Sequence, residues 1–405
     1  MVSYSVYDGD NRVRRYADTL VRYGFEVDAF AMWRVGNPSL GDVLNGVRVH
    51  RLQGRIKNEK TKFTYLWRLL AFFVRSMWMV TKEHWKKPYD LVHVHSVPDF
   101  EVFAAIFAKL TGAKVILDIH DMVPEFYASK FGISKDALVF KALVGIERVS
   151  TAFADHVIAS NHIWEKRLHS RGVAPSKVTA IINYPDLHVF RQQGRTRTDN
   201  KFVLLYPGSM THHQGLDIAI RAFAKIHERV PNAEFHIYGS GDRLDSLKAL
   251  VAQLGLQAKI FFKGSLVVEK LVRVMENADL GVVPKRKDGF GNEAFSTKIP
   301  EFMAMGVPVI IPNTAIDSYY FNDSVATFFE ANEDSSLADA MLRLIANRDL
   351  RERQVQNALV FVQDYSWEKN QWLYLDAVRK LLKPTPAKPT EAKQAELRPS
   401  SRQGD

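Results

Sequence analysis

The sequence is informative first for what it lacks. None of its 405 residues is cysteine, which excludes disulfide bonds, thiolate zinc sites and cysteine nucleophiles. No apolar core of signal-peptide length precedes the first charged side chains. The most apolar long segment, residues 63–80, is interrupted by Arg68 and Arg75, and each arginine costs about 2.5–3.5 kcal/mol at a bilayer centre. We therefore expect a cytoplasmic protein without a membrane-spanning helix.

Several ligand-binding motifs are absent as well. The Gly-Ser-Gly at 239–241 begins a dinucleotide fingerprint, but Leu244 stands where its third glycine belongs, which disfavours an NAD-type oxidoreductase. The sequence contains no Walker lysine loop, zinc-binding helix signature or nucleophile elbow. The Asp-Gly-Asp at 8–10 could offer a carboxylate pair to a metal, but Asp-Gly is also a strong turn signal. We expect no cofactor and no metal.

The residues that are present fit two globular domains. The apolar fraction of 46% and the charged fraction of 25% are close to the averages for soluble proteins and exclude a disordered or fibrous chain. A length of 405 residues corresponds to two domains of roughly 100–200 residues each. Short β-rich runs alternate with helix-length segments, as in doubly wound parallel sheets. The clearest runs are the predicted strands at 2–7, 26–33, 47–52, 90–95, 114–119, 156–160, 202–206, 234–238, 260–263, 280–284 and 307–311.

The pattern breaks once, and that break separates two α/β halves. We predict a first domain over 1–190, a polar linker over 191–201, a second domain over 202–365, a closing helix over 366–382 and a disordered, proline-rich tail over 383–405. Glycine-containing turns follow strands of the second half at 207–208, 239–241 and 264. At such positions open α/β sheets expose their ligand crevices.

The net charge of +10 is concentrated in one segment. Residues 51–87 hold ten basic side chains and two acidic ones, which suits a polyanion, an anionic membrane face or phosphorylated substrates. Read as a helix, this segment places Arg68, Arg75 and Lys82 in one basic stripe. It would suit an interfacial helix on anionic lipid at the inner membrane face, or an ordinary surface helix. Its aromatic residues follow helical order rather than single-strand stacking order, so specific nucleic-acid binding is not expected.

The stretch 291–311, GNEAFSTKIPEFMAMGVPVII, carries the most chemistry. Seven residues separate Glu293 and Glu301, and Ser296 or Thr297 is well placed as a helix N-cap. Pro300 is tolerated in a first helical turn. Such a helix would direct free amides at an anion, with a carboxylate on each side to hold polyol hydroxyls. The alternative is an ordinary capped helix with two surface acids.

With this segment the chain resembles the retaining glycosyltransferases of the GT-B fold, glycosyltransferase family four, over residues 2–380. The Glu-x7-Glu segment is the most specific part of the resemblance. The other matching motifs, in the expected order, lie at 90–95, 116–125, 154–161, 204–223, 235–242, 260–266 and 278–286. The resemblance implies two facing Rossmann-like domains with a C-terminal crossing helix.

The resemblance also implies roles for individual residues. Glu301 would accept hydrogen bonds from the donor ribose, and Glu293 would contact the transferred sugar. His120 occupies the family's histidine position beside the sugar and the reacting phosphate. The alternative for His120 is a strand-end histidine paired with Asp121. The expected donor-binding set is Gly208, Ser209, Gly241, Gly264, Ser265, Ser296, Thr297 and Glu301.

The chain departs from the family at the Gly-Arg-x5-Lys pattern, where it has Ser209 and Gln214. The two missing cations normally neutralise the diphosphate leaving group. Lys298 is the first substitute, ahead of Lys285 and Arg286. We therefore expect His120, Glu293 and Lys298 to form the catalytic set. A second departure is the short first strand, from which we expect Met1 to lie downstream of the family's usual start.

The acceptor half is less specific. Asp10, Arg12, His95 and Asp99 stand on predicted loops or helix starts that could face the cleft. We expect a metal-independent, retaining hexosyltransferase that moves a sugar from a nucleotide-sugar donor, a UDP-sugar first, to a saccharide or lipid-linked acceptor of a cell-surface polysaccharide or glycolipid. The alternatives are a nucleotide-sugar epimerase on the same scaffold and a non-catalytic sugar-nucleotide-binding subunit.

Overall fold

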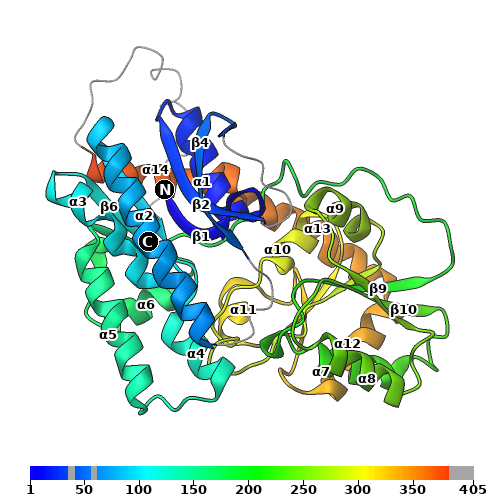
Figure 1. Cartoon of the computed structure of the whole chain (residues 1–405). Coiled ribbons are helices and arrows are strands. Elements are labelled where there is room, and N and C mark those ends of the chain that lie inside the picture. The colour runs from blue at the N-terminus through cyan, green and yellow to red at the C-terminus, as the bar shows by residue number, and fades with distance from the viewer. Residues whose placement is uncertain (35–41, 56–61, 383–405) are drawn as a thin grey trace, which may run out of the picture.

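The computed structural model describes residues 1–34, 42–55 and 62–382 (Figure 1). The chain forms two α/β domains that face each other, each built on its own sheet. This arrangement confirms the predicted fold class of two Rossmann-like domains. The predicted tail at 383–405 lies outside the described residues.

The N-terminal sheet contains eight strands within the described residues, in the order β3-β4-β2-β1-β5-β6-β7-β8. All neighbours are parallel except β3, which pairs antiparallel with β4 at one edge. This edge strand was not among the predicted strands. The strands are β1 (Val2–Val6), β2 (Val27–Arg34), β3 (Asp42–Leu44), β4 (Val47–Arg55), β5 (Leu91–His95), β6 (Lys114–Ile119), β7 (His156–Ala159) and β8 (Val178–Ala180).

The C-terminal sheet contains six strands within the described residues, in the order β11-β10-β9-β12-β13-β14. All of its pairs are parallel. The apolar runs that predicted the strands are buried, because helices cover both faces of such a sheet. The strands are β9 (Phe202–Pro207), β10 (Ala233–Tyr238), β11 (Ile260–Gly264), β12 (Leu280–Val282), β13 (Val309–Pro312) and β14 (Thr327–Phe329).

Helices flank both sheets, with α7, α8 and α12 below the C-terminal sheet and α9, α10 and α13 above it in Figure 1. Residues 99–110 begin as a 3₁₀ helix, η2 (Asp99–Ala105), which is followed by α3 (Ile106–Leu110). The other α-helices are α1 (Asn11–Arg22), α2 (Lys62–Lys86), α4 (Val123–Phe131), α5 (Leu138–Phe153), α6 (His162–Ser170), α7 (Leu216–Ile226), α8 (Leu244–Gln253), α9 (Val268–Glu276), α10 (Lys298–Ala304), α11 (Ala315–Tyr320), α12 (Asp334–Ala346), α13 (Arg348–Asp364) and α14 (Trp367–Leu381).

Helix α14 crosses back from the C-terminal domain to the N-terminal one. Its Trp367 Nε1 donates to Thr19 Oγ1 of α1 at 3.0 Å. The Tyr374 ring stacks on Tyr16 with centroids 4.2 Å apart. One cluster of buried apolar residues therefore runs through both domains, and the crossing helix is a structural part of the first.

The segment between the two sheets, which contains the predicted linker 191–201, is fixed to the C-terminal domain. Arg197 pairs with Asp279, and Arg195 Nη1 lies 2.8 Å from the same carboxylate. The backbone amide of Gly194 donates to Glu276 at 2.5 Å. The polar composition of this stretch thus reflects ion pairs on the surface of the second domain.

Candidate active site

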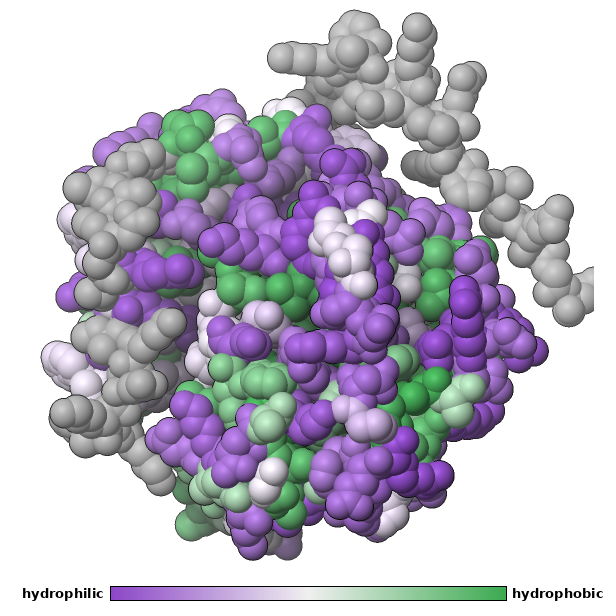
Figure 2. All heavy atoms as spheres, turned by 90° about the vertical axis from the view of Figure 1, so that its right-hand side faces the viewer, coloured by the Kyte–Doolittle hydropathy of each residue, from purple (hydrophilic) through white to green (hydrophobic). Residues whose placement is uncertain are grey.

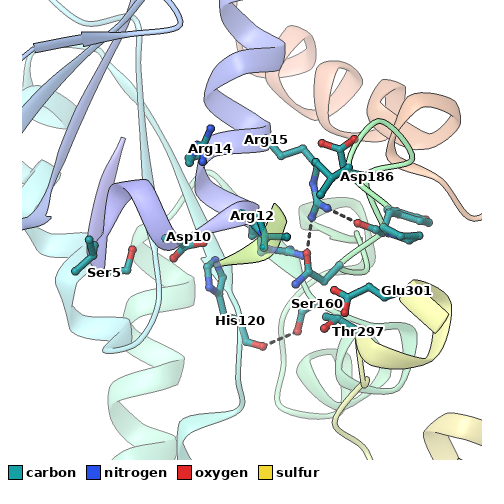
Figure 3. Close-up of a pocket in the computed structure, with 18 of the residues that line it drawn as sticks. Ser5, Asp10, Arg12, Arg14, Arg15, His120, Ser160, Asp186, Thr297 and Glu301 are labelled. Atoms are coloured by element: carbon teal, nitrogen blue, oxygen red, sulfur yellow. Dashed lines mark hydrogen bonds between the residues drawn. The ribbon is translucent and has the colours of Figure 1, made fainter. Parts of the chain in front are cut away.

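One cavity of about 1710 Å³ lies between the domains. The N-terminal wall follows the ends of β1, β2, β4 and β6 and the start of α1, and the C-terminal wall follows the turns after β10 and before α10. Figure 3 shows Thr297 and Glu301 on one side of the cavity and His120 and Asp10 on the other. Carboxyl ends of parallel strands meet here, which is where open α/β sheets bind ligands.

Glu301 is the carboxylate that the C-terminal domain presents to the cavity from α10. Burial raises the pKa of Glu301 to about 7, although the charge of Lys298 and a hydrogen bond from Thr297 oppose that rise. Thr297 occupies the predicted N-cap position, but its side chain does not cap the helix. Ser296 is buried with its hydroxyl unpaired. The Ser296 hydroxyl therefore keeps its hydrogen-bonding capacity, although Ser296 lies outside the cavity lining, whereas the Thr297 hydroxyl already bonds Glu301.

Lys298 lies where the family pattern lacks its cations. Its Nζ donates to Gln214 Oε1 at 3.1 Å, and its chain packs over Gly208 so closely that a Cβ there would collide with Cε. Burial lowers the pKa of Lys298 to about 8. The structure pairs the other two candidate substitutes elsewhere: Lys285 Nζ lies 2.9 Å from Asp317, and Arg286 lies 2.5 Å from Asp217. Both side chains therefore already have carboxylate partners, and their role as substitutes for the missing cations stays a prediction.

The glycine turns of the C-terminal domain pack tightly on one another. A Cβ at Gly239 would collide with the Gly208 carbonyl, and a Cβ at Gly241 would collide with the Met210 carbonyl. Gly241 lines the cavity, whereas Gly208, Gly264, Ser209 and Ser265 lie beyond its lining. Ser265 Oγ meets Ser240 Oγ at 3.2 Å, and the Ser209 carbonyl accepts from Tyr206 at 2.8 Å. These turns form one unit behind the cavity.

Glu293 does not line the cavity. Arg167 of α6, in the N-terminal domain, pairs with it and also with Glu125 at 2.7 Å. The second carboxylate oxygen of Glu293 is buried without a partner. Asn161 Nδ2 donates to the Glu293 backbone carbonyl at 3.0 Å. The first glutamate of the motif therefore takes part in an interdomain ion pair, which no signal in the sequence predicts.

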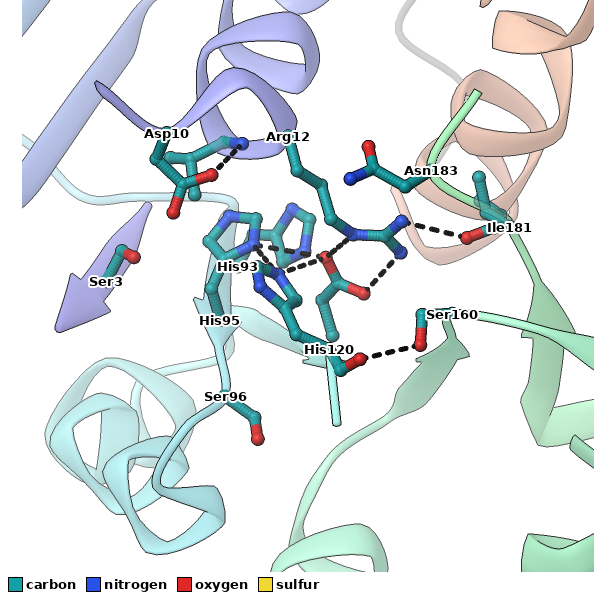
Figure 4. Close-up of polar contacts among 12 residues, drawn as sticks. Ser3, Asp10, Arg12, His93, His95, Ser96, His120, Ser160, Ile181 and Asn183 are labelled. Carbon is teal, nitrogen blue, oxygen red and sulfur yellow. Dashed lines mark hydrogen bonds and ion pairs between the residues drawn. The ribbon is translucent and has the colours of Figure 1, made fainter. Parts of the chain in front are cut away.

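A buried polar cluster supports the N-terminal wall (Figure 4). Arg12 contacts both Asp118 oxygens at 2.8 and 2.9 Å, and His120 Nε2 lies 2.9 Å from Asp118 Oδ2. Burial alone would raise the pKa of Asp118, but the charges of Arg12 and His120 hold it well below its usual range. His120 thus pairs with Asp118 and not with Asp121. Asp118 was not among the predicted site residues, because an acid inside the apolar run 114–119 looks like part of a strand.

Two of the four predicted acceptor-side residues line the cavity and two do not. Arg12 lines it while paired with Asp118, and Asp10 lines it while its Oδ1 accepts from Val13 N at 3.1 Å as the cap of α1. His95 is buried in β5, and burial lowers its pKa to about 4. Asp99 is also buried, and Ser96 donates to it at 2.6 Å. The prediction that His95 and Asp99 face the cleft is wrong.

Ligand atoms of His93, His95 and Asp118 lie within 4.8 Å of one another, which is close enough for a metal ion. Both Asp118 oxygens, however, already accept from Arg12. His93 Nδ1 meets the Tyr374 hydroxyl at 2.9 Å, which ties the cluster to the crossing helix. The residues fit a hydrogen-bonded support for His120 better than a cation site.

The predicted basic stripe on α2 is not a row of free side chains, because two of its three residues are bound to the neighbouring strand. Arg68 donates to the Gly54 carbonyl, and Arg75 Nη1 donates to Gln53 Oε1 at 2.6 Å, so both are tied to β4. Lys82 is exposed over the Trp78 ring, 4.9 Å from its centroid. The three residues therefore do not form a row of free cations. No helix among the described residues is long and apolar enough to cross a membrane.

Two facing parallel-sheet domains with a ligand cavity between their strand ends define a GT-B type protein. Two family models divide the chain between them: the glycosyl transferase 4-like domain matches residues 9–183, and glycosyl transferases group 1 matches residues 190–360. The chain belongs to the family-four-like glycosyltransferases of the GT-B fold.

Individual relatives agree with this assignment. An uncharacterized glycosyltransferase of Methanocaldococcus jannaschii is 30% identical, although the match spans only 49% of this chain and 49% of that protein. A GDP-mannose:cellobiosyl-diphosphopolyprenol alpha-mannosyltransferase of Xanthomonas oryzae is 25% identical over 71% of this chain and 73% of that protein. The structure of sucrose-phosphate synthase from Thermosynechococcus elongatus has a TM-score of 0.77 at 19% identity, covering 94% of this chain and 98% of that one.

Proposed function

We propose that this chain is a retaining glycosyltransferase that moves a sugar from a nucleotide-sugar donor to a saccharide or lipid-linked acceptor. The supporting observation is the interdomain cavity, which has His120 on one wall and Thr297 and Glu301 on the other. A site between two domains can hold two substrates and exclude water when the domains close.

In this proposal the C-terminal domain holds the donor. Glu301 accepts hydrogen bonds from the ribose hydroxyls, and Lys298 neutralises the diphosphate after leaving Gln214. Glu293 contacts the sugar once it has exchanged Arg167 for sugar hydroxyls. Burial lowers the pKa of Lys298 although the charge of Glu301 opposes that fall, and an incoming diphosphate would add a stronger anionic partner for this ammonium.

The reaction breaks the bond between the anomeric carbon and the donor phosphate oxygen. The acceptor hydroxyl forms the new bond on the same face, and its proton moves to the departing phosphate oxygen. Lys298 stabilises the negative charge that develops on the leaving group. His120, oriented by Asp118, lies beside the reacting atoms.

A UDP-sugar is the donor expected from the resemblance, whereas the Xanthomonas relative is named for GDP-mannose. A thermal-shift titration with UDP, GDP and their sugars tests the donor directly, because a ligand that binds only the folded state raises its melting temperature. A selective rise followed by acceptor-dependent release of the nucleoside diphosphate is the expected result. Release without an acceptor, or epimerised donor, would favour the epimerase. Binding without turnover across an acceptor panel would favour a non-catalytic subunit.

We further propose that α2, α3 and α5 rest on an anionic membrane face. These helices meet around η2 and carry 12 of the 19 exposed large apolar side chains of the described residues, and Lys82 lies over the Trp78 ring. Figure 2 shows the opposite side of the molecule as mainly hydrophilic, with apolar residues in separate patches. Tryptophans beside lysines suit a lipid interface. The exposed set is Leu66, Trp67, Leu70, Val74, Trp78, Trp85, Phe107, Leu110, Leu138, Val139, Ile146 and Val149.

Co-sedimentation with vesicles of phosphatidylglycerol and phosphatidylcholine tests this surface. Replacing Trp67, Trp78 and Trp85 together by glutamine should abolish binding, because it removes the aromatic rings that would enter the lipid interface. The fold should remain intact, because these side chains are 60–74% exposed. Trp372→Gln, on α14 with 58% exposure, is the matched control and should bind normally. Unchanged binding of the triple variant would contradict the proposal. Loss of a concentration-dependent dimer in that variant would instead assign this face to a second copy.

A further inference from the structure

Five arginines line the N-terminal side of the cavity, and they fall into two groups. Arg12 and Arg15 are buried and have fixed partners. Arg12 pairs with Asp118, and Arg15 donates to the Tyr184 carbonyl and to Asn183. These two guanidinium groups hold the domain together and have little freedom to bind a ligand.

Arg14, Arg34 and Arg55 form the second group, which we call the arginine triad. None of the three makes an ion pair with a carboxylate of the described residues. Among the described residues, the Arg14 guanidinium makes one hydrogen bond, a long one of 3.3 Å to the Asp8 carbonyl. The nearby Asp8 carboxylate is engaged by Arg51 at 3.2 Å. The triad therefore presents its guanidinium groups to the cavity without a direct carboxylate partner, although the Asp18 carboxylate in the same lining lies close enough to Arg14 to interact with its charge.

The sheet itself brings two members of the triad together. Arg34 ends β2 and Arg55 ends β4, and the two residues are direct partners in the parallel register. Both are exposed. Like charges on neighbouring positions of adjacent strands repel, so this pair weakens the free protein unless an anion lies between them. The Arg34 guanidinium also lies beside Gly9, at the start of the segment that leads into α1.

We propose that the arginine triad binds a phosphate or diphosphate group carried by the acceptor. Guanidinium groups match phosphate oxygens in bidentate geometry. The inference rests on the proposed function, in which the donor diphosphate is held by Lys298 in the opposite domain. A second anion site on the acceptor side would fix one end of the acceptor while its hydroxyl reaches toward His120. The acceptor is then a phosphorylated saccharide or a lipid diphosphate.

Inorganic pyrophosphate is the probe, titrated calorimetrically into full-length protein already saturated with the nucleoside diphosphate that binds best. Wild-type protein should bind it under these conditions. The double variant Arg34→Gln/Arg55→Gln should bind at least tenfold more weakly while its nucleoside diphosphate affinity and melting temperature do not fall. Arg229→Gln, an exposed arginine outside the cavity lining, is the matched control and should behave as wild type.

The outcomes separate this inference from the proposed function. Nucleoside diphosphate binding with no pyrophosphate site, or equal pyrophosphate affinity in the double variant, would overturn the triad assignment alone. Absence of any nucleoside diphosphate binding would overturn the proposed function. Displacement of pyrophosphate by a hexose phosphate would identify a soluble acceptor, and displacement by a short-chain polyprenyl diphosphate a lipid-linked one. Failure of both to displace it would overturn the assignment to an acceptor.

Discussion

The alkaline limit of donor binding should be set by Lys298. Burial lowers the pKa of this side chain from its usual 10.5 to about 8, and a shift of this size costs the charged form about 3 kcal/mol at 1.36 kcal/mol per unit. A bound diphosphate favours the ammonium, so only protein protonated at Lys298 binds it well. The dissociation constant of the nucleoside diphosphate should therefore rise about 50-fold between pH 8 and pH 10.

Titration calorimetry from pH 6.5 to pH 10 measures this dependence. Lys298→Arg is the matched control, because an arginine stays charged throughout the range and should flatten the alkaline limb. Any titration of the nucleobase is common to both proteins and cancels in the comparison. Lys298→Ala should bind weakly at every pH, with little dependence. Parallel alkaline limbs in wild type and Lys298→Arg would refute the reasoning.

Three further predictions concern the residues around this lysine and the support of the N-terminal wall. Gly208→Ala should weaken nucleoside diphosphate binding with little loss of stability, because the added Cβ collides only with the flexible end of Lys298 and the Tyr206 hydroxyl; binding and melting curves measured together would check it. Glu301→Gln should lower the initial rate of transfer at least tenfold, or about 1.4 kcal/mol in barrier, and an unchanged rate would remove its ribose role. Asp118→Asn leaves the buried Arg12 charge uncompensated and should cost about 3–5 kcal/mol in urea unfolding; a loss below 1 kcal/mol would contradict that estimate.

The sequence predicted the architecture well because the signals for it are local. Apolar runs such as 114–119 indicate buried strands from a few consecutive residues. The short antiparallel strand β3 has no such signal, because a segment of three residues is too short to show an alternating apolar pattern and fits a loop equally well. The 3₁₀ helix η2 could not be told from an α-helix by its sequence, because its composition suits both kinds of helix.

The site was harder to predict because it depends on contacts between side chains of elements that are far apart in the sequence. Glu301 and Thr297 both line the cavity, as expected for two residues that are one helical turn apart and share a helix face. The engagement of Glu293 by Arg167 joins residues of different domains, and no sequence spacing reports it. The same holds for Arg68, whose partner lies on β4. Side chains that long can turn inward or outward, and only the packed neighbours decide which.

The crossing helix α14 has a mechanical consequence. The chain passes between the domains twice, once in the segment leading to β9 and once between α13 and α14. Because Trp367 and Tyr374 fix α14 to the N-terminal domain, the domains are joined at two points rather than one. Two such joints define a hinge axis, so the domains can open and close over the cavity by rotation about that line but resist twisting. A proteolytic nick in the first joint alone would leave the two halves attached and in register.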